Sequence, residues 1–320
     1  MGHRHDPMDG STRMKTAFCF PGQGSQAVGM GVAFADASPA AAAVFAEASE
    51  AFGSDLLELC RSGPQERLDQ TEITQPALTT ASVACLAAVR EAGIQADVAI
   101  GHSAGEYAAL VAAGILTVGD AVRLTRARGE ATAAAAARTP GAMSAIIGLE
   151  DAQVEELCDG IEGVWVANYN CPGQIVVSGE SAAVEQLNEA AKEAGARRAL
   201  TLAVSGAFHS PLTAAAADDL RPALLAATFS APTSAFFSTV TCQLEDEANL
   251  VQILEDQLGA PVRFTQAIQA LAAKGVTTCI EVGPGGVLAG LMRRIDRNLT
   301  ALAISDPESL AKAQEVLGNG

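Results

Sequence analysis

A serine between two glycines, in the segment Gly101-His102-Ser103-Ala104-Gly105, constrains the fold of this chain most strongly. The segment follows the run Asp97-Val98-Ala99-Ile100 and precedes an alanine- and leucine-rich stretch, so it predicts a strand, a tight turn and a helix. A sharp turn of this kind needs small residues two before and two after its apex. It directs the Oγ of Ser103 into a cleft and leaves the N–H of Ala104 at a helix N-terminus, where developing negative charge is stabilised. The segment therefore predicts a nucleophilic serine.

A serine nucleophile needs a base within hydrogen-bond reach. Two of the four histidines lie in the polar stretch 1–13. His102 directly precedes the serine, and on a tight turn its side chain should project away from it. His209 remains as the candidate base, in a strand-like run that ends in turn residues. A structural histidine is the alternative. No carboxylate between Ser103 and His209 stands out, so the group that orients the imidazole stays open and includes a backbone carbonyl.

Composition limits the classes of partner. The 320 residues suffice for one large domain or two smaller ones with a buried core. The net charge of −17 argues against nonspecific binding of nucleic acid. No apolar stretch reaches the roughly 18–20 residues of a membrane helix. We therefore expect neither a nucleic acid nor a membrane as partner.

Cysteine usage indicates a reducing compartment. The seven cysteines are scattered and form no Cys-x-x-Cys pair, which argues against a disulfide framework or a zinc site. Residues 1–13 are charged and lack an apolar segment, so they are interpreted as a tag, a linker or a disordered leader and not as a secretory signal. These features predict a cytoplasmic protein without a metal site.

A glycine-rich loop, 21–26, follows the first expected strand, Thr16–Phe20. It lacks the G-K-[ST] ending and the G-x-G-x-x-G spacing of phosphate-binding loops, which argues against a nucleotide site. Instead of binding a nucleotide, this loop could bring backbone N–H groups and Gln23 close to a substrate.

Strands and helices alternate along the chain, which favours a parallel α/β sheet. After Pro140-Gly141 the order becomes β-α-β-β-α-β, which is the ferredoxin-like arrangement. Its expected strands are 142–149, 164–168, 174–178 and 199–204, with helices at 152–158 and 181–194. Other helices are expected at 40–52, 76–92, from 117, and at 212–227, 248–258 and 265–274, with strands at 234–240 and 278–282.

This order predicts a fold and its division. We expect a parallel-sheet, α/β-hydrolase-like core with an inserted, smaller ferredoxin-like subdomain. The catalytic subdomain is discontinuous and covers 14–138 and 206–314, the insert covers 139–205, and 1–13 is the leader.

Arg128 falls on the apolar face of the helix expected from Thr117. At about 100° per residue, Val118, Ala121 and Leu124 form one apolar side, and Arg128 lies within it. A guanidinium keeps its charge, so on a buried face it needs a carboxylate or phosphate partner. That partner is either a buried Asp or Glu in a structural ion pair, or the carboxylate of a substrate.

Several segments occur in the order typical of one family. They are Phe20-Pro-Gly-Gln-Gly-Ser-Gln26, Thr74-Gln-Pro-Ala-Leu78, Gly101-His-Ser-Ala-Gly-Glu-Tyr107, Arg128-Gly129, Asn168-Tyr-Asn-Cys-Pro-Gly-Gln174, Gly206-Ala-Phe-His209 and Glu281-Val-Gly-Pro-Gly285. From about Met14 to the C-terminal region, the chain resembles the malonyl-CoA:acyl carrier protein transacylases, acyltransferases of fatty acid and polyketide synthesis. It departs from many members at Phe237-Ser238-Thr239, where they have two asparagines, and at Ala104, where a larger aliphatic residue is common.

The resemblance implies a two-step transfer. Ser103 is acylated by malonyl-CoA, and the phosphopantetheine thiol of acyl carrier protein then takes the malonyl group, with His209 as general base and acid. The resemblance further implies an oxyanion hole from the N–H groups of Gln23 and Ala104, and Arg128 pairing with the malonyl carboxylate. It implies no cofactor, since the partner protein carries the phosphopantetheine.

The resemblance also assigns finer roles. Gln75 and Asn170 belong to the substrate-binding set. Phe208 leaves little room for a 2-methyl branch on the acyl group. A backbone carbonyl near Pro261-Val262-Arg263, assigned to Arg263, is expected to orient His209.

Three other functions compete with this one. A stand-alone acyltransferase of a polyketide pathway has the same chemistry and another carrier. A serine esterase or thioesterase shares the turn at Ser103, but Arg128 on an apolar face disfavours neutral ester substrates. A non-catalytic carrier-binding protein would lack the nucleophile or the base, and Ser103 and His209 are both present.

Docking of an acidic carrier protein on a chain of net charge −17 requires a local basic patch. The dense basic clusters outside the Arg128 helix are Arg197-Arg198 and Arg293-Arg294-Arg297. For each cluster, a solvated helix end is the alternative interpretation.

Overall fold

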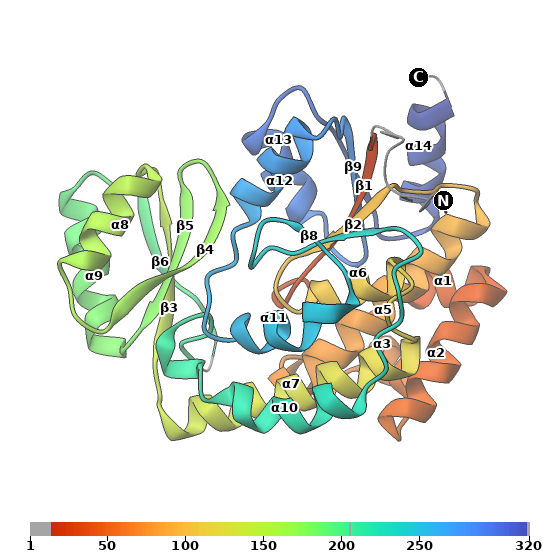
Figure 1. The fold of residues 1–320 in the computed structure, drawn as a ribbon, viewed down its shortest axis with the longest axis horizontal. Helices are drawn as coiled ribbons and strands as arrows, with labels where there is room; N and C mark the ends of the chain where they lie inside the picture. Colours follow the sequence, from red (N-terminus) through yellow and green to blue (C-terminus); the bar gives the residue numbers. More distant parts are fainter. Residues whose placement is uncertain (1–13, 205, 319–320) are drawn as a thin grey trace, which may run out of the picture.

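The computed structural model describes residues 14–204 and 206–318, which form two α/β units beside each other (Figure 1). The expected leader, 1–13, lies outside the described residues. The larger unit contains a six-stranded sheet and the smaller one a four-stranded sheet. The predicted α/β-hydrolase-like core with an inserted ferredoxin-like subdomain is confirmed, and the strands of the insert lie between residues 142 and 201.

The large sheet has the strand order β10-β9-β1-β2-β7-β8. Its strands are β1 (Thr16–Phe20), β2 (Val98–Gly101), β7 (Ala235–Phe237), β8 (Leu244–Glu245), β9 (Thr278–Val282) and β10 (Thr300–Ile304). All neighbours pair in parallel except β8, which pairs antiparallel to β7 at the edge. Parallel sheets are covered on both faces, and β1 and β2 are accordingly buried almost throughout.

Two helical layers cover this sheet (Figure 1). Alternate residues of β1 face opposite layers: Phe18 and Phe20 pack with the first core cluster, Ala17 and Cys19 with the second. The first layer is built mainly from α2 (Pro39–Phe52), α5 (Thr71–Glu91), α6 (Gly105–Ala112), α7 (Val118–Arg138) and α10 (Ala216–Ala226). The second contains α12 (Phe264–Ala273) and α13 (Val287–Ile295).

Shorter helices complete the large unit. They are α1 (Val32–Ala37), α3 (Leu56–Ser62), α4 (Gln65–Leu68), α11 (Leu250–Asp256) and α14 (Pro307–Gly318), with 3-10 turns at Pro211–Thr213 and Glu247–Asn249. No helix in the described ranges is both long and apolar enough to cross a membrane. All seven cysteines lie within these ranges and are free.

The small unit follows the predicted β-α-β-β-α-β order. Its elements are β3 (Ala142–Ile147), α8 (Asp151–Asp159), β4 (Val164–Cys171), β5 (Gln174–Gly179), α9 (Ser181–Glu193) and β6 (Arg198–Thr201), and its antiparallel sheet has the order β4-β5-β3-β6. Helices α8 and α9 pack on one face. The other face carries Met143 and Val176, which pack with Phe208 of the large unit.

Several element boundaries differ from those expected from the sequence, and those of α5 and β7 bear on the site. Helix α5 begins at Thr71, one turn and more before Pro76, because its first turn is buried against α7 and Gly129 leaves room for the backbone of Thr71 and Glu72. Strand β7 ends at Phe237 and not at residue 240. Past this point Thr239 turns inward and binds a buried carboxylate of α6.

Candidate active site

Ser103 lies at the turn between β2 and α6 with a left-handed φ of 53°. A Cβ on Gly101 would collide with the backbone of Gly105 and Glu106, and a Cβ on Gly105 would collide with the carbonyl of Phe20. Both glycines are therefore required by close packing, as the sequence predicted. A non-glycine residue in this conformation is strained, and it persists only where the surrounding structure fixes it. The turn places the serine in the lining of a cavity.

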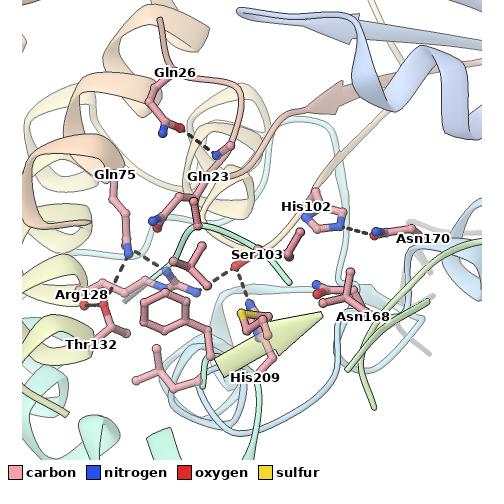
Figure 2. Close-up of a pocket in the computed structure, with 18 of the residues that line it drawn as sticks. Gln23, Gln26, Gln75, His102, Ser103, Arg128, Thr132, Asn168, Asn170 and His209 are labelled. Atoms are coloured by element: carbon pink, nitrogen blue, oxygen red, sulfur yellow. Dashed lines mark hydrogen bonds between the residues drawn. The ribbon is translucent and has the colours of Figure 1, made fainter. Parts of the chain in front are cut away.

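The Oγ of Ser103 lies 2.7 Å from Nε2 of His209 (Figure 2). The Nδ1 of His209 faces two backbone carbonyl oxygens, those of Gln257 at 3.0 Å and Ala260 at 3.1 Å. Carbonyls only accept, so Nδ1 carries the proton and Nε2 is free to accept the serine hydroxyl. Burial, together with the nearby charge of Arg128, lowers the pKa of His209 to about 3. The imidazole is therefore neutral and poised as a base.

The carbonyls that orient His209 differ from the predicted one. The prediction named Arg263, but the carbonyl of Arg263 lies 3.8 Å from the Sγ of Cys242, and Arg263 is the N-cap residue of α12. Gln257 caps the C-terminus of α11, and Ala260 follows in the next turn. Carbonyls at a helix C-terminus have no partner within the helix, which leaves them free to accept from a side chain. Backbone carbonyls therefore orient His209, as predicted, but they belong to residues that precede Arg263 in the chain.

Arg128 is only 4% exposed and extends from α7 toward the serine (Figure 2). Its Nη1 donates to Oε1 of Gln75 at 2.9 Å, its Nε to Oε1 of Gln257 at 3.2 Å, and its Nη2 to Oγ of Ser103 at 3.1 Å. Within residues 14–204 and 206–318, no carboxylate forms a salt bridge with it. Among these residues, then, the ion-pair alternative fails. Neutral amides hold a buried cation beside the nucleophile.

A cavity of about 500 Å³ separates the two units at this point. Its polar lining includes Gln23, Gln75 and Arg128. Its apolar lining includes Met143 and Val176 from the small sheet. The apolar lining also includes Leu202, Val204, Phe208 and Leu258.

The predicted site residues largely converge on this cavity. Gln23, Gln75, Ser103, Arg128, Asn170, Phe208 and His209 line it. Asn170 binds Nε2 of His102 at 2.9 Å through its Oδ1, so His102 is turned away from the serine, as expected. Ala104 lies at the start of α6, and Arg263 is not among the lining residues.

The loop after β1 packs directly on the turn at Ser103. The N–H of His102 donates to the carbonyl of Phe20 at 2.9 Å, and a Cβ on Gly22 would collide with the carbonyl of His102. This contact brings Gln23 to the cavity that Ser103 also lines. The N–H of Ala104 lies at a helix N-terminus, where backbone N–H groups have no acceptor within the helix. The placement suits an oxyanion hole, which stays a prediction.

The family model described as an acyl transferase domain matches residues 17–313. The chain belongs to the acyl transferase family. It is 45% identical over 308 residues to the malonyl CoA-acyl carrier protein transacylase of Bacillus subtilis (strain 168), covering 95% of this chain and 97% of the relative. It is also 45% identical over 305 residues to the protein of that name from Escherichia coli (strain K12), covering 94% and 99%.

Solved structures of malonyl-transferring enzymes are also similar to this chain. An acyl-carrier-protein-S-malonyltransferase from Bartonella henselae has a TM-score of 0.91 at 40% identity, covering 95% of this chain and 100% of that one. A malonyl-transacylase in complex with its type II PKS acyl-carrier protein has a TM-score of 0.90 at 41% identity, covering 94% and 99%. This acyl transferase therefore shares its fold over nearly the full length with both.

Two buried residues of this acyl transferase were missed from the sequence as parts of the site. The carbonyl and the amide of Gln257 contact His209 and Arg128, and Glu106 binds Gln257 in turn. A carboxylate in an otherwise apolar helix was the available signal for Glu106. No pattern marks Gln257. Among the described residues, no group of three or more His, Cys, Asp and Glu side chains could hold a metal ion.

Proposed function

We propose that this acyl transferase moves the malonyl group of malonyl-CoA to the phosphopantetheine thiol of acyl carrier protein, through an ester on Ser103, and so supplies extender units for fatty acid biosynthesis. The supporting observation is the buried guanidinium of Arg128, 3.1 Å from the nucleophilic oxygen. Its hydrogen-bond partners in the described chain are neutral, so the malonyl carboxylate supplies an anionic partner in direct contact with it.

The first half-reaction acylates the enzyme. Nε2 of His209 takes the hydroxyl proton while Oγ of Ser103 attacks the thioester carbonyl carbon. The N–H groups of Gln23 and Ala104 stabilise the oxyanion of the tetrahedral intermediate, each by about 3–4 kcal/mol. The C–S bond then breaks, His209 returns the proton to the departing CoA sulfur, and a malonyl ester remains on Ser103.

The second half-reaction reverses these roles. The carrier's phosphopantetheine thiol gives its proton to Nε2 of His209, and its sulfur attacks the ester carbonyl. The same two N–H groups stabilise the second oxyanion. Collapse of the intermediate breaks the C–Oγ bond, and His209 protonates Ser103. The nucleophile is regenerated without any cofactor.

Two residues that line the cavity, Arg128 and Phe208, determine which acyl group the enzyme accepts. Acetyl offers no carboxylate and leaves the guanidinium of Arg128 without its charged partner, which disfavours acetyl. Gln75 holds that guanidinium at Nη1, so its contribution to substrate binding is partly indirect. Phe208 occupies the space that a 2-methyl branch needs. We place Asn170, which faces the same cavity, in the substrate-binding set.

The carrier protein docks, in this proposal, on the two arginine clusters. The N–H of Gly148 donates to the carbonyl of Gly173 at 3.0 Å. A Cβ on Gly148 would lie 3.0 Å from Cβ of Arg197, and one on Gly173 would lie 4.0 Å from Nη2 of Arg294. Arg197 and Arg294 therefore lie on either side of the contact between Gly148 and Gly173 and belong to one surface. We include their neighbours Arg198 and Arg293 in this proposed docking surface for the carrier protein.

Charge reversal tests the docking surface. The double variant Arg197→Glu and Arg294→Glu should raise KM for carrier protein several-fold and leave KM for malonyl-CoA unchanged. Arg123→Glu, on an exposed face of α7, is the matched control. The same KM for carrier protein in all three proteins would eliminate this surface, and Arg198 and Arg293 with it.

One observation favours a second candidate. The similar malonyl-transacylase from a complex with a type II PKS acyl-carrier protein makes a polyketide pathway the alternative destination of the malonyl group. The chemistry at Ser103 is the same in both.

We place the enzyme in the cytoplasm, since its seven cysteines are unpaired.

The function is tested by mixing the protein with malonyl-CoA and carrier protein that bears phosphopantetheine. The carrier should gain the mass of one malonyl group, and carrier without phosphopantetheine should gain none. Release of CoA with neither protein malonylated would indicate a thioesterase. No reaction at all would indicate a non-catalytic protein.

A further inference from the structure

A carboxylate is completely buried behind the nucleophile. Glu106 lies on the first turn of α6 with no exposed surface, and it forms no salt bridge within the described ranges. Its Oε1 accepts from the N–H and the Oγ1 of Thr239, both at 2.6 Å, and from Oγ of Ser238 at 3.4 Å. Its Oε2 accepts from Nε2 of Gln257 at 2.6 Å. Glu106 does not line the cavity.

The contacts of Glu106 match an ionised carboxylate. Burial raises its pKa, and the hydrogen bonds from Thr239, Gln257 and Ser238 oppose that rise. Because N–H groups only donate, the N–H of Thr239 needs an acceptor at Oε1 and Nε2 of Gln257 needs one at Oε2, and an ionised carboxylate supplies both. Burial lowers the pKa of the Arg128 guanidinium, and the negative charge of Glu106 lies close enough to oppose that lowering.

The amide of Gln257 stands between these two charges. Its Nε2 donates to Glu106 and, at 3.3 Å, to the carbonyl of Ser103, while its Oε1 accepts from Nε of Arg128 at 3.2 Å. Turned by 180°, the amide would set an acceptor against the carboxylate and a donor against the guanidinium. Glu106 therefore determines which end of the amide Arg128 meets.

We propose that Glu106 is a positioning residue for malonyl selection, because it fixes the amide of Gln257 that holds the guanidinium of Arg128 at the nucleophile. This inference rests on the proposed malonyl transfer. It assigns Glu106 no contact with the substrate. The hydroxyl groups of Ser238 and Thr239 anchor the other oxygen of the same carboxylate.

The substitution Glu106→Gln keeps the shape and removes one acceptor. The new amide oxygen stays with the donors of Ser238 and Thr239, so the new NH₂ faces Nε2 of Gln257. Either these two donors separate or the amide of Gln257 turns, and both disturb its contact with Arg128. The ratio of kcat/KM for malonyl-CoA to kcat/KM for acetyl-CoA should fall about tenfold or more, the size of a lost hydrogen bond to a charged group.

The ratio separates positioning from mere stability, since the folded fraction of the sample cancels from it. Glu281→Gln is the matched control: Glu281 is equally buried and accepts from the N–H of Ala289 at 2.8 Å, outside the cavity. It should lower the melting temperature and leave the ratio unchanged. Circular dichroism and thermal melts establish that each variant is folded.

A second variant covers a failure of Glu106→Gln to fold. Gln257→Met removes the amide and retains the backbone carbonyl that His209 binds, so it should lower the ratio in the same direction. An unchanged ratio in folded Glu106→Gln, or in Gln257→Met where the first does not fold, overturns the inference. Failure of the unmodified protein to transfer malonyl would instead refute the proposed function, so the two failures are distinguishable.

Discussion

Replacement of Arg128 by alanine removes the buried cation beside Ser103 and leaves the base in place. The guanidinium is 4% exposed, and its Nη2 lies 3.1 Å from the nucleophilic oxygen, so a malonyl group on that oxygen meets it in a desolvated setting. A bidentate contact comprises two hydrogen bonds to charged groups, each contributing about 1.5–3 kcal/mol. Their loss corresponds to about 3–6 kcal/mol, or a decrease of roughly 10²–10⁴ in kcat/KM for malonyl-CoA.

Acetyl-CoA lacks the carboxylate, so its kcat/KM should change little or rise in Arg128→Ala. The assay is the rate of enzyme acylation by each donor, followed by intact mass after rapid quenching. Arg123→Ala is the control, since Arg123 lies on the same helix and its side chain is 58% exposed. The reasoning is refuted if malonyl kinetics are unchanged. It is also refuted if both donors slow equally, which would mean that Arg128 acts on the serine and not on the substrate carboxylate.

Three further predictions follow from the same geometry. The folded pKa of His209 is about 3, below the value near 6.5 of an unperturbed histidine, so the base stays neutral at physiological pH. The rate of acylation should therefore not decrease as the pH is lowered from about 8 to about 5. A decrease in that rate centred near pH 6.5 would contradict this. Phe208→Ala should raise kcat/KM for methylmalonyl-CoA relative to malonyl-CoA about tenfold or more, as measured by acylation rates, whereas an unchanged ratio would remove Phe208 as the selector. Gly105→Ala should lower the free energy of unfolding in urea by about 1–3 kcal/mol or more through collision with the carbonyl of Phe20, while Gly290→Ala, with open space around it, should not; equal stabilities would refute the packing argument.

The buried neutral histidine also has a consequence for stability. At pH values between about 3, the folded pKa of His209, and about 6.5, its unfolded pKa, this histidine is protonated in the unfolded chain but not in the folded protein. The contribution of His209 to stability is therefore complete above about pH 6.5 and decreases as the pH falls toward 3.

Local patterns made much of the fold predictable. The turn at Ser103, the β-α-β-β-α-β order and the start of α7 at Thr117 depend on neighbouring residues, and each is present in the structure. Arg128 was identifiable because a permanent charge on an apolar helical face violates the pattern around it. Such a violation is visible in one helix alone.

Contacts between distant segments were not predictable. The carbonyls of Gln257 and Ala260 reach His209 because α11 ends at that point, and no residue type marks a backbone carbonyl. The early start of α5 depends on its packing against Gly129 of α7. The link from Glu106 to Arg128 passes through Gln257, more than a hundred residues away in sequence.

The central claim is that Ser103 carries the malonyl group, and intact mass measures it directly. The protein is mixed with malonyl-CoA or acetyl-CoA beside a Ser103→Ala control, and carrier protein with phosphopantetheine is then added. The account predicts a malonyl adduct that requires Ser103, disappears when the carrier gains the same mass, and is weak or absent with acetyl-CoA. A malonyl adduct of equal yield on Ser103→Ala, or CoA release with no adduct and no malonylated carrier, would contradict it.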